Sequence, residues 1–397
     1  MTAGSIEPGV EDMVAPTWRD GKRYAWLLGL LVPSLPLGAW ALVEATGLGV
    51  FWFLGPAVVF GLFPILDLIV GADADNPPDS VIAWLEEDRY YRWVIYLFIP
   101  LQYVSLVAAC WLWSSGSLSV VDGVGLALTT GMVAGVAINT AHELGHKRAG
   151  LERWLSKVAL AQTGYGHFFI EHNRGHHVRV ATPEDPASAR LGESFYEFLP
   201  RTVAGSVRSA WGLERRRLAR MGRGPWTIRN DILSAWAMTA LLLGALVAAF
   251  GVVVLPYLLL QAALGFALLE VVNYLEHYGL LRGRRDDGRY EIIRPEHSWN
   301  SNNVASNVLL YHLQRHSDHH AHPLRRYQAL RHEEGAPQLP TGYAGMIVLA
   351  AIPPLWRRVM DHRLLEHYGH DLERANINPR TRRRVLARAA AAGGGAA

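Results

Sequence analysis

Histidine is the residue type that most clearly indicates chemistry in this sequence, because its seventeen histidines crowd into a few short blocks. HELGHK at 142–147 contains a pair, and EHNRGHH at 171–177 and LQRHSDHH at 313–320 each contain a triplet. Residues four apart lie on one face of a helix, so two imidazoles at that spacing can bind one metal ion. A pair at a membrane edge could simply extend toward water, but a protein core seldom holds three imidazoles side by side without a ligand. The blocks therefore predict metal binding.

A fourth block, NYLEHYG at 273–279, adds one histidine directly after an apolar segment. The total of nine imidazoles is too many for one ion with four to six ligands and suits two ions with four or five each. We expect the triplet of 171–177 to lie on one face of a helix that ends before Pro183. Imidazole binds iron, copper and zinc alike, so spacing alone leaves the metal open. The candidate ligands are His142, His146, His172, His176, His177, His277, His316, His319 and His320.

Carboxylates within or beside these blocks are the candidates for supporting roles. Neutral imidazoles leave two metal ions with uncompensated positive charge, so nearby acids are expected to orient the ring nitrogens that do not bind metal and to balance that charge. Each acid could equally be a solvated loop residue. The catalytic candidates are Glu143, Glu276, Asp318 and Asp185, with Glu171 as a further candidate for the supporting role.

The rest of the chain has the composition of a membrane protein. Half of its 397 residues are hydrophobic and only 18% are charged, which is unusual for a soluble protein of this length. The single cysteine, Cys110, excludes an internal disulfide and a thiolate-held iron centre built from this chain alone. The first sixteen residues lack a basic start and an apolar core, so we expect no cleavable secretory signal.

Six apolar segments are long enough to cross about 30 Å of hydrocarbon as helices. They lie near 24–46, 50–70, 93–114, 121–140, 232–250 and 252–275. The predicted fold class is an all-α integral membrane protein with six transmembrane helices and a histidine-rich cytoplasmic di-metal domain. The apolar stretch at 343–359 is too short and too interrupted by proline to cross, so we expect a buried or interfacial helix there.

Lysine and arginine lie only in the segments that this order of spans places on one side of the membrane. The N-terminal arm and the second-to-third connection hold five, residues 141–231 hold fifteen and residues 276–397 hold eighteen, whereas the three other short connections hold none. The positive-inside rule therefore predicts that both termini and all four blocks face the cytoplasm. The predicted regions are an arm at 1–23, four spans at 24–140, the first two blocks at 141–231, two spans at 232–275, the other two blocks at 276–379 and a flexible basic tail at 380–397.

Together the four blocks resemble the alkane 1-monooxygenase family, the bacterial membrane alkane hydroxylases related to the membrane fatty-acid desaturases and to xylene monooxygenase. HELGHK, EHNRGHH and LQRHSDHH resemble the three histidine boxes of the broader superfamily, and NYLEHYG resembles the box that marks the alkane and xylene branch. The resemblance implies a centre of two non-haem iron ions held by the nine histidines. It implies a bacterial inner-membrane enzyme that uses O2 to convert a terminal methyl group of a medium- or long-chain n-alkane to a primary alcohol.

The resemblance also implies an external electron donor, rubredoxin, which an NAD(P)H-dependent reductase reduces. The arginines at 215, 216, 217, 220 and 223 could steer an acidic rubredoxin to the cytoplasmic face, or they could only fix topology or bind anionic lipid. Membrane lipid and an alkane are the other expected partners, and nucleic acid is not. Small residues in the spans, among them Gly55, Gly131, Gly135 and Gly265, could leave room for a hydrocarbon or serve helix packing.

Four other functions are compatible with parts of the sequence. HELGH matches the H-E-x-x-H pattern of zinc proteases, with Glu143 as the general base, but that reaction leaves the other blocks unexplained. A fatty-acid desaturase or a hydroxylase of aromatic methyl groups would use the same boxes on another apolar substrate. A metal transporter would carry its histidines near the middle of the spans rather than at their ends.

Overall fold

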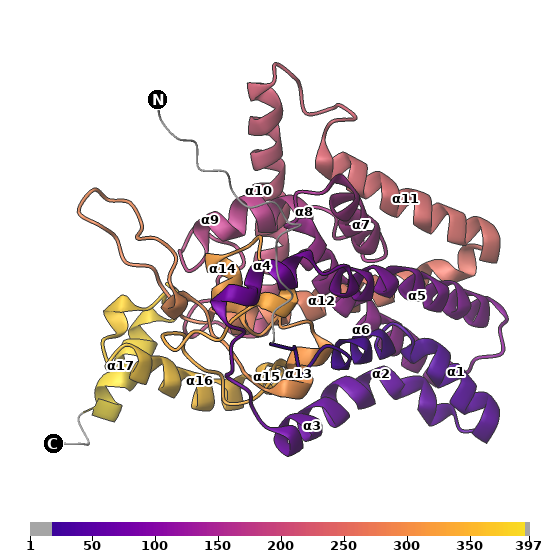
Figure 1. Cartoon of the computed structure of the whole chain (residues 1–397), viewed down its shortest axis with the longest axis horizontal. Helices are drawn as coiled ribbons and strands as arrows, with labels where there is room; N and C mark the ends of the chain where they lie inside the picture. The colour runs from indigo at the N-terminus through magenta and orange to yellow at the C-terminus, as the bar shows by residue number, and fades with distance from the viewer. Residues whose placement is uncertain (1–17, 394–397) are drawn as a thin grey trace.

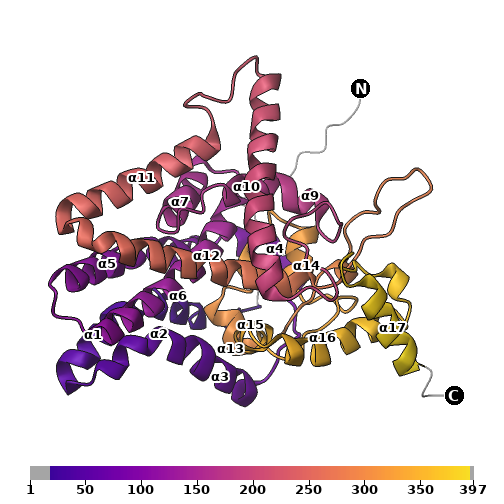
Figure 2. The ribbon, with the colours of Figure 1, turned by 180° about the vertical axis from the view of Figure 1, so that it is seen from behind.

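A computed structural model describes residues 18–393, with side chains described up to residue 387. The described chain is helical, and its β-structure is limited to four isolated bridges. Figures 1 and 2 show the long apolar helices lying side by side, with the shorter segments that carry the histidine blocks gathered at one end of them. The predicted all-α membrane fold is confirmed.

Five helical segments of the described chain are long and apolar enough to cross a membrane. The second apolar segment is a composite of short helices, ending in α2 (Leu54–Pro56), a π-helix (Ala57–Leu62) and α3 (Phe63–Val70). The others are α5 (Arg89–Ser114), α6 (Val120–Gly145), α11 (Asp231–Phe250) and α12 (Leu255–His277). Each of these four begins at or near a residue suited to a helix start. Asp88, Ser119 and Asn230 accept backbone hydrogen bonds at the N-termini of α5, α6 and α11, and Pro256 occupies the first turn of α12.

The first predicted span is divided rather than continuous. A 3-10 helix (Ala25–Leu31) and α1 (Leu35–Thr46) meet at an angle of 65° across residues 32–34. Pro33 lies in this break and Pro36 in the first turn of α1, where a missing N–H is tolerated. The six predicted spans are therefore five candidate spans, or six if the bent pair counts as one.

Helix α6 lies at the centre of the candidate membrane helices. In its most apolar stretch of 18 residues, 78% of the residues are buried, against 17% in α11. Close packing on α6 requires small residues. A Cβ at Gly131 would lie 2.7 Å from the Leu264 Cβ, and one at Gly55 would lie 2.6 Å from the Cα of Thr129. These glycines therefore serve helix packing.

Shorter helices surround the histidine-bearing end. They are α4 (Asp79–Glu87), α7 (Gly150–Ala161), α8 (Phe168–Glu171), α9 (His177–Arg179), α13 (Val304–Leu309) and α14 (His316–Ala321). The long helix α10 (Phe195–Arg220) projects away from this end (Figure 1). The stretch expected to be interfacial forms α15 (Tyr343–Ala350) and the start of α16 (Pro353–His367), and Tyr343, Met346 and Trp356 are buried there.

The C-terminal segment differs from its predicted description. Residues 380–397 were expected to form a flexible tail, but Arg382–Gly393 form helix α17. Val385 and Leu386 pack against the apolar cluster formed by α15, α16 and the end of α12. Residues 394–397 and most of the N-terminal arm, residues 1–17, lie outside the described chain.

Candidate metal centre

The structure brings all nine candidate histidines together in two adjacent groups. One nitrogen from each member of a group lies within 4.8 Å of a nitrogen from every other member. The five-histidine group consists of His142, His146, His172, His177 and His319. The four-histidine group consists of His176, His277, His316 and His320. The division into five and four histidines agrees with the expectation of four or five ligands for each of two ions.

The nitrogen spacings within the groups fit a shared metal ion. His142 and His319 approach through their Nε2 atoms at 2.9 Å, as do His316 and His320. Metal–nitrogen bonds of about 2.0–2.1 Å would place neighbouring ligand nitrogens about 2.9–3.4 Å apart. The Nε2 atoms of His146 and His176 are buried and have no hydrogen-bond partner among the described residues. Orphaned nitrogens at the centre of a ligand cluster are the expected consequence of a metal-binding site.

A π-helical turn distributes the second block between the two groups. Residues His172–His176 form a π-helix between α8 and α9, with His177 as its C-cap. In an α-helix, residue i+5 would point roughly 140° away from residue i. The wider π-turn brings His177 back beside His172, with their Nε2 atoms 3.0 Å apart. His176 belongs to the other group, although the three rings remain neighbours, with centroids 4.7–6.0 Å apart. The triplet therefore shares one side of the helical segment, as expected, but serves two groups.

Gly175 and the ion pair between Glu171 and Arg179 accompany this turn, and of these residues only Glu171 was expected to have a role. Glu171 and Arg179 form an ion pair across the turn, with Nη2 of Arg179 2.6 Å from Oε1 of Glu171. Arg179 also donates a hydrogen bond to the Ser209 hydroxyl of α10 at 2.7 Å. A Cβ at Gly175 would lie 2.6 Å from both Arg179 Nη2 and a carboxylate oxygen of Glu171. The glycine within EHNRGHH was the available signal for this close approach.

The third block is divided in the same manner by ordinary helical geometry. His316 and His320 are four residues apart on α14 and share the four-histidine group. His319 projects from another side of α14 into the five-histidine group, where its Nε2 lies 3.2 Å from that of His177. The remaining ligands come from the ends of two membrane helices, His142 and His146 at the end of α6 and His277 at the end of α12.

Burial keeps the loop histidines neutral. Removal from water lowers the pKa of His172, His177, His316, His319 and His320 well below the usual range, and neighbouring imidazoles lower it further. A neutral imidazole has a lone pair available for a metal ion.

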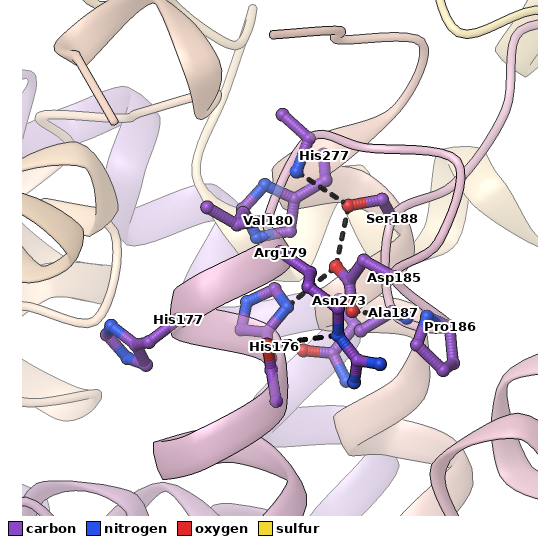
Figure 3. Close-up of polar contacts among 12 residues, drawn as sticks. His176, His177, Arg179, Val180, Asp185, Pro186, Ala187, Ser188, Asn273 and His277 are labelled. Carbon is purple, nitrogen blue, oxygen red and sulfur yellow. Dashed lines mark hydrogen bonds and ion pairs between the residues drawn. The ribbon is translucent and has the colours of Figure 1, made fainter. Parts of the chain in front are cut away.

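Asp185 is one of two predicted carboxylates that reach a candidate ligand (Figure 3). Its Oδ2 accepts a hydrogen bond from Nδ1 of His176 at 2.8 Å and another from the Ser188 hydroxyl at 2.7 Å. Burial raises the pKa of the Asp185 carboxyl, but the contacts with His176 and Ser188 outweigh burial, and the net shift is downward. An ionised Asp185 therefore fixes the tautomer of His176 and leaves its Nε2 free for metal.

Glu276 is the second carboxylate, and it approaches the ligand side of a ring. Its Oε2 lies 3.3 Å from Nε2 of His316, the nitrogen that faces His277 and His320. The side chain is 2% exposed, and the Tyr343 hydroxyl is its other polar neighbour. Glu276 thus places a carboxyl oxygen beside one ligand nitrogen of the four-histidine group, Nε2 of His316.

The other predicted carboxylates turn away from the rings. Glu143 contacts Lys147 at 3.0 Å and the backbone N–H of Tyr327. Asp318 pairs with Arg325 and accepts from the backbone N–H of Arg331. Glu171 belongs to the pair with Arg179. The described contacts of these three acids include none with a ring nitrogen of the nine histidines, and Glu143 is not poised as the general base of a protease.

An apolar cavity leads from the membrane helices to both groups. Its histidine end is lined by His142, His172 and His316, and its polar lining is completed by Asn139, Asn273 and Glu276. The remaining lining is apolar and includes Val59 and Phe63 of the second apolar segment and Leu268 and Leu269 of α12. Gly135 also faces the cavity, where a Cβ would lie 2.5 Å from Leu268. The site can therefore present an apolar molecule to metals at the membrane edge.

Comparisons with known proteins agree with this architecture. The fatty acid desaturase family model matches residues 120–350. The chain is 49% identical over 372 residues to an alkane 1-monooxygenase of Acinetobacter baylyi, covering 93% of this chain and 91% of the relative. It is 48% identical over 364 residues to one of Pseudomonas putida, covering 91% and 90%. A xylene/toluene monooxygenase hydroxylase component of Pseudomonas putida is more distant, at 29% identity over 237 residues, or 58% of this chain and 62% of that relative.

Proposed function

The chain belongs to the alkane 1-monooxygenase family, within the fatty acid desaturase superfamily, and from that premise we propose that it hydroxylates the terminal methyl group of medium- or long-chain n-alkanes at a di-iron centre. The observation that carries this proposal is the apolar cavity whose end is lined by histidines of both groups. An alkane offers no polar group for recognition, so an apolar passage that excludes water is what its binding requires.

The nine histidines are the proposed iron ligands, five for one ion and four for the other. Iron bound there supplies the activation of O2 that oxidation of an unactivated methyl group requires. The reaction consumes one alkane, one O2, two electrons and two protons, and it yields one primary alcohol and one water. The chain's own residues orient the methyl group, keep water out through the apolar lining and hold the imidazoles in the binding tautomer, as Asp185 does for His176.

The cavity is narrow, with about 50 Å³ of free space. That space holds only a few water-sized molecules, so an alkane of medium length requires its lining side chains to move. Leu268, Leu269 and Ile347 are aliphatic side chains whose rotamers can open this passage. Chain-length preference would then follow from how far the lining can retract.

Electron supply from outside completes the proposal. We assign it to rubredoxin and its NAD(P)H-dependent reductase, since the only cysteine of this chain, Cys110, is buried in α5. The arginines near the end of α10 support an acidic partner: Arg215, Arg216 and Arg220 are exposed, whereas Arg217 pairs with Glu214. Replacing Arg215, Arg216 and Arg220 with glutamine should raise the KM for rubredoxin and weaken its salt dependence. An unchanged KM would place the docking surface elsewhere.

The protein is a multi-pass membrane protein. We propose that both termini, both histidine-bearing regions and the metal centre lie on the cytoplasmic side, as the distribution of Lys and Arg indicates. We also propose that the predicted domain boundaries hold. Cys110 is buried, so introduced cysteines report orientation cleanly. A membrane-impermeant maleimide should label Thr46→Cys but not Arg223→Cys in intact spheroplasts, and labelling of Arg223→Cys alone would reverse the topology.

The decisive experiment measures metal content and product together. Purified protein in lipid is supplied with n-octane, 18O2, NADH, rubredoxin and its reductase. Two irons per chain with 18O in 1-octanol are expected. Stoichiometric zinc with no oxygen-dependent product would refute the proposal. Double bonds in an acyl chain would instead indicate a desaturase, and a preference for xylene over octane would indicate the aromatic branch.

A further inference from the structure

A basic hollow lies between α16 and α17, away from the histidine groups. It has about 220 Å³ of free space, and three arginines line it, Arg357 and Arg358 from α16 and Arg384 from α17. The described contacts include no hydrogen bond or ion pair for these three guanidinium groups, although Arg357 lies near enough to Glu197 of α10 for their charges to attract. Unpaired guanidinium groups converging on one hollow are suited to an anion with several oxygens.

Nearby acids leave this positive charge largely uncompensated. Asp361 lines the same hollow, and its Oδ1 accepts a hydrogen bond from the Tyr278 hydroxyl at 2.7 Å. Glu366 contacts His362 at 3.2 Å, and Glu373 pairs with Arg382. Three arginines therefore lie against Asp361 and, on the side of α10, Glu197, so the net charge at the hollow stays positive and the ligand that fits it is anionic.

An exposed apolar row precedes the two arginines of α16 along the chain. Val348 of α15 is 41% exposed, Ile352 is 48% exposed and Leu355 of α16 is 43% exposed. Leu355 lies three residues before Arg358, so the two share one side of α16. Trp356 packs on Tyr274, in the last turn of α12, with ring centroids 4.9 Å apart. The start of α16, which carries Arg357 and Arg358, therefore packs on the end of α12, where we expect this membrane helix to reach the water interface.

We propose that this hollow binds the phosphate of an anionic phospholipid. The three guanidinium groups bind the phosphate oxygens, and Val348, Ile352 and Leu355 contact the acyl chains of the same lipid. A free phosphate would use the arginines alone and would leave the apolar row exposed. Because the arginines come from two helices, the bound lipid also ties α17 to α16.

The test titrates the full-length protein in detergent with phosphatidylglycerol, phosphatidylcholine or inorganic phosphate, with native mass spectrometry reporting bound lipid. Phosphatidylglycerol should bind, and Arg357→Gln/Arg358→Gln/Arg384→Gln should weaken its binding on the order of a hundredfold, because each arginine near an anionic headgroup contributes about tenfold or less. The same lipid should protect the backbone amides of α17 from hydrogen exchange in the wild-type protein only.

A matched control removes three charges elsewhere. Arg284, Arg285 and Arg289 are exposed in the 281–294 hairpin, and their replacement by glutamine should leave phosphatidylglycerol binding unchanged. An unchanged melting temperature of the first variant separates loss of binding from loss of folding, and Arg384→Gln alone serves if the triple variant does not fold. Equal binding by variant and wild type would overturn the proposal. Competition by inorganic phosphate at the lipid's own concentration would also overturn it, since the site would then be a free-phosphate site.

Discussion

The two histidine groups lie side by side and receive ligands from the same loop segments, yet they have different surroundings. In the five-histidine group, the rings pack mainly on one another. The ring centroid of His146 lies within 5.0 Å of those of His142, His172, His177 and His319. In the four-histidine group, Asp185 contacts His176, Glu276 approaches His316 and the backbone oxygen of His297 lies 3.3 Å from Nδ1 of His277.

This difference indicates how one chain arranges two unequal groups of candidate metal ligands. The group with fewer imidazoles has the carboxylates, so negative charge and hydrogen bonding compensate for the missing ligand. The five-histidine group relies on the number of its neutral nitrogens. We therefore expect the four-histidine site to be sensitive to its carboxylates and the five-histidine site to tolerate the loss of one ligand better.

The largest effect is expected from removing a ligand of the smaller group. His316→Ala leaves three imidazoles in its site, whereas His146→Ala leaves four in the other. His316→Ala should reduce hydroxylation about 10³-fold or more, because the loss of bound metal forfeits several kcal/mol of transition-state stabilisation. Metal analysis should give about one ion per chain for His316→Ala and a value closer to two for His146→Ala. Equal metal loss in both variants would remove the distinction between the groups.

Glu276→Gln should have the next largest effect. The substitution keeps the shape of the side chain but replaces an ionisable carboxyl group, 3.3 Å from His316 Nε2, with an amide that cannot carry negative charge. Activity should fall toward a hundredfold, with weaker metal binding in the four-histidine site. Mössbauer spectra of the iron-loaded variant should show a change in one of two iron signals. A change in both signals, or in neither, would contradict a local role for this carboxylate.

Asp185→Asn is expected to act less strongly, because it touches the site through His176 rather than directly. The amide can present its oxygen or its nitrogen to Nδ1, so the tautomer of His176 is no longer fixed. Activity should fall about tenfold, and the same iron signal that responds to Glu276→Gln should change. Ser188→Ala removes only one hydrogen bond to Asp185 and is the matched weaker variant. An effect of Ser188→Ala equal to that of Asp185→Asn would indicate a general loss of structure.

Much of this organisation follows from local sequence patterns. Apolar length gives the membrane helices, and histidine spacing gives the nine residues that converge, because both signals are contained in short windows. The division of His172, His176 and His177 between two groups was not predictable in that way, because it depends on a π-turn. That turn is accompanied by the contact of Arg179 with Ser209 on α10, far along the chain.

Partner choice among charged residues was the least predictable feature. Glu143, Glu276, Asp185 and Asp318 are similar in the sequence, since each lies within or beside a histidine block. The tertiary fold decides that Arg325 reaches Asp318 and that the Asp185 carboxylate meets a ring nitrogen. The helical C-terminal segment was missed for a related reason, because α17 packs its few apolar side chains, such as Val385, on a surface formed by distant residues.

Gly175→Ala is expected to have the smallest effect on activity. It should also affect the two histidine groups equally. The added methyl group would press on the Glu171–Arg179 pair beside the π-turn, at a cost of about 1–3 kcal/mol of stability. Because this turn supplies His172 and His177 to one site and His176 to the other, both iron signals should change together while activity falls only several-fold. Gly244→Ala in α11, where a Cβ meets nothing within 4 Å, is the control and should change neither signal. A change confined to one iron signal in Gly175→Ala would mean that the turn positions the ligands of a single site.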